Sequence, residues 1–158
     1  MRDMREIIKG IIVLILLTGL CTTCDSTGEE HLLHIPSGAF LDALIARGVD
    51  TNGDGMISYA EAEGTEVIVL PPSGISDLTG IEAFLNLESL TITLNPLSEI
   101  DLSSNSRLRY LDICHCELTD LGLSSNPLLE VLNCGWNRLT GLDLSANQEL
   151  SALICNNN

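Results

Sequence analysis

Apolar and polar positions recur with a period of 21 residues from Leu87 to the end of the chain. Within each unit a short stretch alternates between the two kinds, as in Leu90-x-Ile92, which predicts a short strand with one face turned inward. Because no unit can bury its own apolar side, neighbouring units have to stack on one another. The units are 87–107, 108–128, 129–149 and an incomplete fourth, 150–158.

Polar residues hold two further fixed positions in each unit. One follows the strand, where a buried amide can satisfy backbone groups as the chain turns. The other lies in a Ser-x-Asn turn that we expect to form a polar corner before the next strand. The first position is held by Asn95, Cys116, Asn137 and Asn158, and the second by Asn105, Asn126 and Asn147.

The repeat unit resembles the leucine-rich repeat family, in particular its 21-residue bacterial class with the consensus LxxLxCxxNxLxxLDLSxNxx. The resemblance covers 87–158, and the stretch 75–87 is similar to the first repeats of internalin-like proteins. It implies a parallel β-solenoid that recognises a protein or another ligand. With a further strand expected at 65–70, the predicted solenoid occupies 65–158.

The last predicted repeat lacks its return leg. We therefore expect its neighbours Leu139, Leu142 and Leu144 to face solvent or a partner. A truncated relative of longer arrays and an open contact edge are the two interpretations, and we favour truncation.

A helix-loop-helix cap is predicted at 36–64, with helices at 38–48 and about 58–63. Between them, DTNGDGMISYAE matches a twelve-residue EF-hand loop, whose alternating carboxylates and amides supply the oxygens that Ca²⁺ prefers. A polar Asp–Gly turn is the alternative, but it does not explain the outer acidic and amide positions. The expected ligands are Asp50, Asn52, Asp54, the carbonyl of Met56, Ser58 and Glu61.

Calcium sensors pair their EF-hands, whereas this sequence carries one such loop. We therefore expect a static site with a Kd of about 10⁻⁴ M or weaker. The loop would act as a structural clip that covers the apolar N-terminal end of the solenoid.

Residues 1–24 have the pattern of a secretory signal. Basic residues precede an apolar run from Gly10 to Leu20, which is shorter than the ~20 apolar residues that a membrane span needs. Lipidation of Cys24, preferred over Cys21, and release without an anchor are equal alternatives. Residues 25–35 are expected to be a linker. We expect an exported protein that is secreted, periplasmic or held at the outer membrane or cell surface by lipid alone.

The charge excludes some classes of function. Without residues 1–24 the chain keeps four basic and 20 acidic residues, which excludes nucleic-acid binding through phosphate contacts. Cys114-His115-Cys116 is a poor zinc site because strand alternation points the histidine away from the cysteines. No arrangement typical of catalysis is present, so we do not expect an enzyme.

The outward strand positions are the best candidate for a binding surface. They would combine with a column one step further on that contains Leu94, His115, Trp136 and Asn157. We predict non-enzymatic recognition of a protein partner there, with a calcium-dependent glycan-binding or adhesion module, or an inactive fragment of a larger surface protein, as alternatives. Trp136 could instead pack onto the lip of the solenoid. The predicted partner-binding residues are Tyr110, Asp112, His115, Asn133 and Trp136.

Overall fold

The computed structural model describes residues 31–36 and 38–158. The predicted signal at 1–24, with Cys24, lies outside the described residues, as does the linker up to residue 30. Within the described ranges, no helix has both the length and the apolar character needed to cross a membrane.

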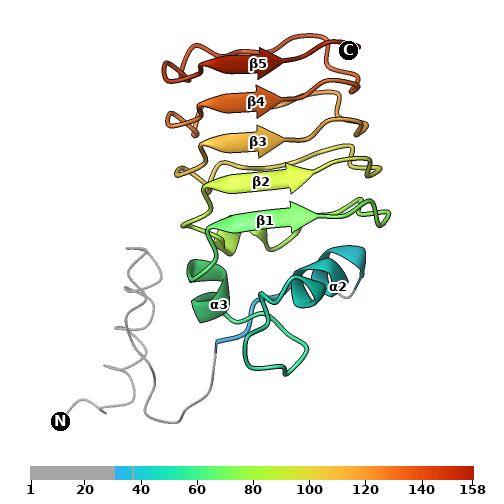
Figure 1. Ribbon diagram of the computed structural model, residues 1–158, viewed down its shortest axis with the longest axis vertical. Helices are drawn as coiled ribbons and strands as arrows, with labels where there is room; N and C mark the ends of the chain where they lie inside the picture. The colour runs from blue at the N-terminus through green and yellow to red at the C-terminus, as the bar shows by residue number, and fades with distance from the viewer. Residues whose placement is uncertain (1–30, 37) are drawn as a thin grey trace, which may run out of the picture. The chain divides into compact units, whose positions relative to one another are not determined.

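Five short parallel strands stack in chain order as a single sheet (Figure 1). From β2 to β5 the paired residues of neighbouring strands are 21 positions apart along the chain, as Leu90 pairs with Leu111. The register equals the sequence period, so every inward leucine lies against the leucine of the next rung. The predicted solenoid is therefore confirmed. The strands are β1 Val67–Leu70, β2 Ser89–Ile92, β3 Tyr110–Asp112, β4 Val131–Asn133 and β5 Ala152–Ile154.

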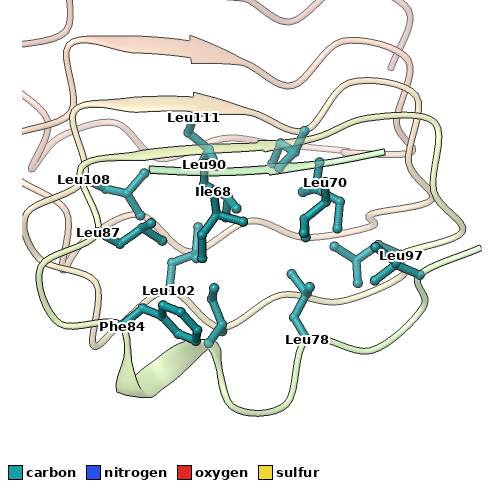
Figure 2. Close-up of a cluster of buried hydrophobic side chains, with 14 of the residues drawn as sticks. Ile68, Leu70, Leu78, Phe84, Leu87, Leu90, Leu97, Leu102, Leu108 and Leu111 are labelled. Carbon is teal, nitrogen blue, oxygen red and sulfur yellow. The ribbon is translucent and has the colours of Figure 1, made fainter. Parts of the chain in front are cut away.

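Leucines from the strands and return legs fill the interior, together with Phe84 (Figure 2). Leu90, Leu111 and Leu132 are fully buried. Full burial of such a side chain stabilises the fold by about 1.5–3 kcal/mol. The fourth residue of this row, Leu153 in β5, is 43% exposed because it belongs to the last rung.

The residues beside the last rung are less exposed than predicted. Leu139 is buried, and Leu142 and Leu144 are half-buried and pack against the core. The asparagine that ends the chain contributes to this, because the Asn158 side chain accepts a hydrogen bond from the Leu139 backbone N–H at 3.1 Å. The expectation that all three leucines face solvent or a partner is therefore wrong for Leu139, which is buried within the chain.

The asparagine position that follows each strand behaves as predicted. Asn95 is buried, and its side-chain oxygen accepts from the N–H groups of Ser73 and Ile75 at 3.0 and 2.9 Å. Its amide donates in turn to the carbonyls of Pro71 and Thr93. One side chain thus replaces several backbone partners as the chain turns out of the strand.

The second asparagine position differs from the polar corner that the sequence predicts. Asn126 is buried, and its amide donates to the Leu102 and Asn105 carbonyls of the previous rung at 3.0 and 2.9 Å. Asn147 makes the equivalent pair of bonds to Leu123 and Asn126. The corner is polar in composition, but its asparagines point into the core and join successive rungs.

Two short helices lie at the β1 end of the stack (Figure 1). Helix α2, Ala39–Ala46, contributes Phe40 and Leu44 to the same buried cluster as the solenoid core. Helix α3, Tyr59–Glu63, is a single turn that ends at Gly64. A short 3-10 helix, η1 at Ile81–Ala83, lies in the first return leg.

Part of the predicted linker belongs to this cap. The Leu33 N–H donates to the Ile57 carbonyl at 2.8 Å, and the Tyr59 N–H donates to the His31 carbonyl at 2.9 Å. Leu32 and Ser58 form an antiparallel bridge between these bonds. Residues 31–33 therefore pair with the end of the predicted EF-hand loop, because the backbone groups at Ile57 and Tyr59 need partners.

We predict that Asn126→Ala lowers the free energy of unfolding by about 1–3 kcal/mol, because two buried carbonyls lose their donor. Urea unfolding followed by circular dichroism measures this loss. Ser124→Ala, at an exposed neighbouring position, is the control and should change stability little. Equal stability of the two variants would show that the buried amide does not hold the rungs together.

Candidate functional site

Three of the predicted partner-binding residues share the outward face of the sheet, here called the strand face. Asp112 of β3 and Asn133 of β4 are a registered pair, so their side chains lie on neighbouring rungs. Tyr110 lies two residues before Asp112 on the same face and forms a side-chain hydrogen bond with it. The structure therefore brings Tyr110, Asp112 and Asn133 together.

Two titratable side chains on the strand face, Tyr110 and Cys114, have raised pKa values beside the Asp112 carboxylate. Partial burial, and then the charge of Asp112, raise the pKa of Tyr110. Partial burial, and then a hydrogen bond to Asp112, raise the pKa of the Cys114 thiol to about 11. Both groups keep their protons at neutral pH, so the thiol is not activated as a nucleophile.

His115 and Trp136 lie one step beyond, in the predicted column. The four residues of this column, here called the ridge, all have left-handed backbone conformations, with φ of 57° at Leu94, 56° at His115, 56° at Trp136 and 58° at Asn157. The rings of His115 and Trp136 stack with centroids 5.0 Å apart and planes 11° from parallel. The column is confirmed.

The left-handed conformation was not evident from the sequence. Asparagine tolerates it, whereas a larger side chain such as leucine or tryptophan is strained there by about 1 kcal/mol or more. The parallel ladder maintains it, since the N–H groups of Leu94, His115 and Trp136 donate to the next rung at 3.2, 3.0 and 2.9 Å. The asparagine at position 157 is the sequence signal that could have indicated it.

A groove of about 530 Å³ runs beside the ridge. The middle residue of each triplet that lines it, such as Asn137, is buried and forms the floor. An ion pair between Arg138 and Glu117, with 3.0 Å between nitrogen and oxygen, lies on the second wall. Sequence reasoning missed this second wall. Its residues are Pro96, Glu117 and Arg138.

The cysteines beside His115 point to different sides. Cys116 is buried, and its thiol donates to the Ile92 carbonyl at 3.3 Å. Cys114 lies on the strand face and His115 projects from the ridge. The three side chains therefore do not converge on one point.

The predicted EF-hand loop is closed by its own carboxylates. Asp50 accepts hydrogen bonds from the N–H groups of Gly53 and Gly55 at 2.7 and 2.9 Å. Asp54 accepts from the Met56 N–H at 2.8 Å, and Asn52 accepts from the Asp54 N–H at 2.9 Å. The glycines have positive φ values of 77° and 81°, as these sharp turns require.

Glu61 joins the two ends of the loop. One carboxylate oxygen accepts from the Thr51 N–H and hydroxyl at 2.7 and 2.9 Å, and the other accepts from the Ser58 N–H and hydroxyl at 2.8 and 2.9 Å. The Ser58 oxygen accepts from the Glu61 N–H, which completes a capping box for α3. Partial burial acts to raise the pKa of Glu61, but these hydrogen bonds outweigh it and lower the pKa to about 2.

The loop contains oxygen ligands that suit a hard cation, but their side chains are not grouped around a metal site. Its carboxylate, amide and hydroxyl oxygens are the groups that Ca²⁺ prefers. Across the described residues, however, no group of three or more His, Cys, Asp or Glu side chains is placed to hold a metal ion. In this structure the oxygens of Asp50, Asp54 and Glu61 bind the loop's own N–H groups instead.

We predict that acid weakens the cap through Glu61. Its pKa is lowered in the folded chain, so its contribution to stability is complete above the ordinary value of about 4.5 and is lost as pH falls toward about 2. Glu61→Gln should lower stability at pH 6 by about 1 kcal/mol, as for a lost helix cap. The difference from the wild type should shrink between pH 4.5 and 2.

Urea midpoints measured across this pH range test the prediction. Glu63→Gln, which changes an exposed carboxylate two residues away, is the control. A constant difference between Glu61→Gln and the wild type at every pH would contradict the assignment.

Comparisons with known proteins support the fold. No family model matches the chain, and no curated protein matches it. Among solved structures, the functional domain of InlJ from Listeria monocytogenes, described as including a cysteine ladder, is 30% identical with a TM-score of 0.67 over 81% of this chain and 30% of that one. The internalin InlF from the same organism is 25% identical with a TM-score of 0.62 over 73% of this chain and 36% of that one.

The chain spans about a third of the length of these two structures. Both structures are similar to this chain over most of its length. The fold is thus an internalin-like leucine-rich repeat solenoid with a helical cap.

Proposed function

We propose that the chain is an exported, non-enzymatic recognition protein that binds a protein partner through the strand face and the ridge. The observation that carries the proposal is the exposed stack of His115 and Trp136 beside Tyr110, Asp112 and Asn133. Large aromatic side chains that remain exposed beside hydrogen-bonding groups are typical of protein interfaces. The similarity to internalins supports a binding role in general.

The chemistry of the surface supports binding rather than catalysis. The pKa of Cys114 is raised to about 11, so its thiol remains protonated. His115 lies against Trp136 rather than beside a nucleophile. Asp112 accepts hydrogen bonds from its own strand neighbours, including the Cys114 N–H at 3.2 Å.

A glycan partner is the weaker alternative. Sugars bind aromatic side chains through the ring face, and His115 covers one face of Trp136. The amide and carboxylate of Asn133 and Asp112 could bind sugar hydroxyls equally well as protein groups. The covered ring face therefore favours a protein partner.

We predict that Asn133→Arg weakens partner binding at least tenfold, because it places a long charged side chain on the strand face. The chain is immobilised and exposed to detergent-extracted surface proteins, and each retained protein is then measured individually for affinity. At least one should bind Asn133→Arg tenfold or more weakly than the wild type.

Thr119→Arg is the matched control, because it adds the same charge at an exposed position on the return leg. It should bind like the wild type. If every retained protein binds both variants equally, the strand face is not the recognition surface.

We further propose that the loop at 50–61 binds Ca²⁺ as a structural clip. The donor set of Asp50, Asn52, Asp54, Ser58 and Glu61, with the carbonyl of Met56, supports this proposal, as do the left-handed glycines. The finding that no three or more His, Cys, Asp or Glu side chains of the described residues are grouped to hold a metal ion counts against it. The antiparallel bridge between Leu32 and Ser58 occupies the position at which paired EF-hand loops contact each other, so the loop has a backbone partner within the chain.

With 1 mM Ca²⁺ and a Kd of about 10⁻⁴ M, binding should stabilise the fold by about 1.4 kcal/mol. We predict that the unfolding midpoint rises by about 4 °C over that in chelator, in one transition that includes the repeats. Differential scanning calorimetry measures it. Asp50→Asn, which keeps a hydrogen-bond acceptor but loses the charge, should abolish the rise.

Two other outcomes are informative. Calcium binding that leaves the repeat transition unchanged would make the cap a separate unit with a regulatory role. No calorimetric response, with no heat in a direct titration, would rule out the calcium site and leave the loop as a turn closed by Glu61.

A further inference from the structure

The ridge combines two unfavourable features that the fold does not need. Leu94 and Trp136 are 58% and 53% exposed, so their apolar surface gains little from burial. Both are also held in the left-handed conformation, which asparagine or glycine would adopt with less strain. Asn157 shows that this position accepts asparagine. Strained residues of this kind gather at ligand-binding sites.

The groove beside the ridge has the dimensions of an extended peptide. Neighbouring strands lie about 4.8 Å apart, so the distance from Leu94 to Asn157 across three rung steps is about 14 Å. An extended chain covers this distance with four or five residues at about 3.3 Å each. The space of about 530 Å³ between the ridge and the Glu117–Arg138 pair is shallow and widely open to solvent.

Charge indicates which peptide the groove favours. The chain has a formal net charge of −15, so a basic segment is attracted and an acidic one repelled before contact. The arginine on the groove, Arg138, is already paired with Glu117, and Arg109 at the other end of the strands is paired with Glu130. The Glu117 side chain remains 47% exposed. Trp136 is 53% exposed and offers a cation the ring face that His115 does not cover.

We propose that the groove between the ridge and the Glu117–Arg138 pair binds an extended segment of the partner that carries lysine or arginine next to an apolar residue. The apolar side chain lies against Leu94 and the aromatic stack, and the cation lies between Trp136 and Glu117. The inference rests on the proposed function, because the ridge borders the strand face. To the proposed function it adds the extended conformation and the positive charge of the partner segment that binds.

The experiment is a selection with a displayed library of random heptapeptides against the chain. Selected peptides should contain more lysine and arginine than the unselected library, and their affinity should fall as salt is raised. Trp136 is the single tryptophan of the sequence, so its fluorescence should change when synthetic copies of the selected peptides bind. Leu94→Asn and Trp136→Asn should each weaken these peptides at least tenfold, with fluorescence polarisation of labelled peptide as the readout.

Asparagine variants keep the test independent of folding, because asparagine suits the left-handed position. Leu94→Asn should unfold at a temperature no lower than the wild type. Leu85→Asn, which replaces a leucine exposed to a similar extent away from the groove, should leave peptide affinity unchanged.

The outcomes separate this proposal from the broader one. If the selected peptides bind Asn133→Arg more weakly than the wild type but bind Trp136→Asn equally well, the groove proposal is overturned. The strand face then remains the proposed recognition surface. Enrichment of acidic or uncharged peptides, or no enrichment at all, would overturn the groove proposal. So would a glycan-array signal that depends on Trp136 when no peptide is selected.

Discussion

The parallel stacking of rungs is the constraint on which every other feature of this chain depends. Each rung is too short to bury its own leucines, so the core exists only between neighbours. Hydrogen bonds in the sheet join the rungs on one side, and the buried amides of Asn126 and Asn147 join them on the other. The side-chain oxygens of Asn105, Asn126 and Asn147 have no hydrogen-bond partner. These residues therefore act through their side-chain N–H groups, which donate to carbonyls of the previous rung.

The two ends of the stack are treated differently. At β1, helix α2 covers the apolar cross-section, and residues 31–33 pair with the loop that joins the two helices. That pairing gives the loop a backbone partner within the chain. Contact between Ile35 and Gly80 adds to it, since a side chain at Gly80 would come within 2.6 Å of Ile35. The cap is thus held at both its N-terminal segment and its core face.

Much of the fold could be predicted because the 21-residue period can be seen in the sequence and equals the register between neighbouring strands. Leu90, Leu111 and Leu132 recur at the spacing that the strand register requires, and the column of His115 and Trp136 follows from the same arithmetic. The left-handed backbone of that column could not be predicted from its leucine, histidine and tryptophan. The ladder imposes this conformation against their own preference. The inward turn of Asn126 and the pairing of Leu33 with Ile57 depend on contacts distant in sequence, which no local pattern reports.

The same constraint explains why the fold does not require the side chains found along the ridge. Hydrogen bonds between the rungs determine the backbone at Leu94, His115 and Trp136, and buried residues such as Asn137 determine how the chain continues. The side chain at each ridge position then contributes little to folding and is free to meet a partner. An unstrained asparagine would satisfy the fold equally well, as Asn157 does. The presence of leucine and tryptophan where asparagine suffices is therefore best explained by what these side chains contact outside the chain.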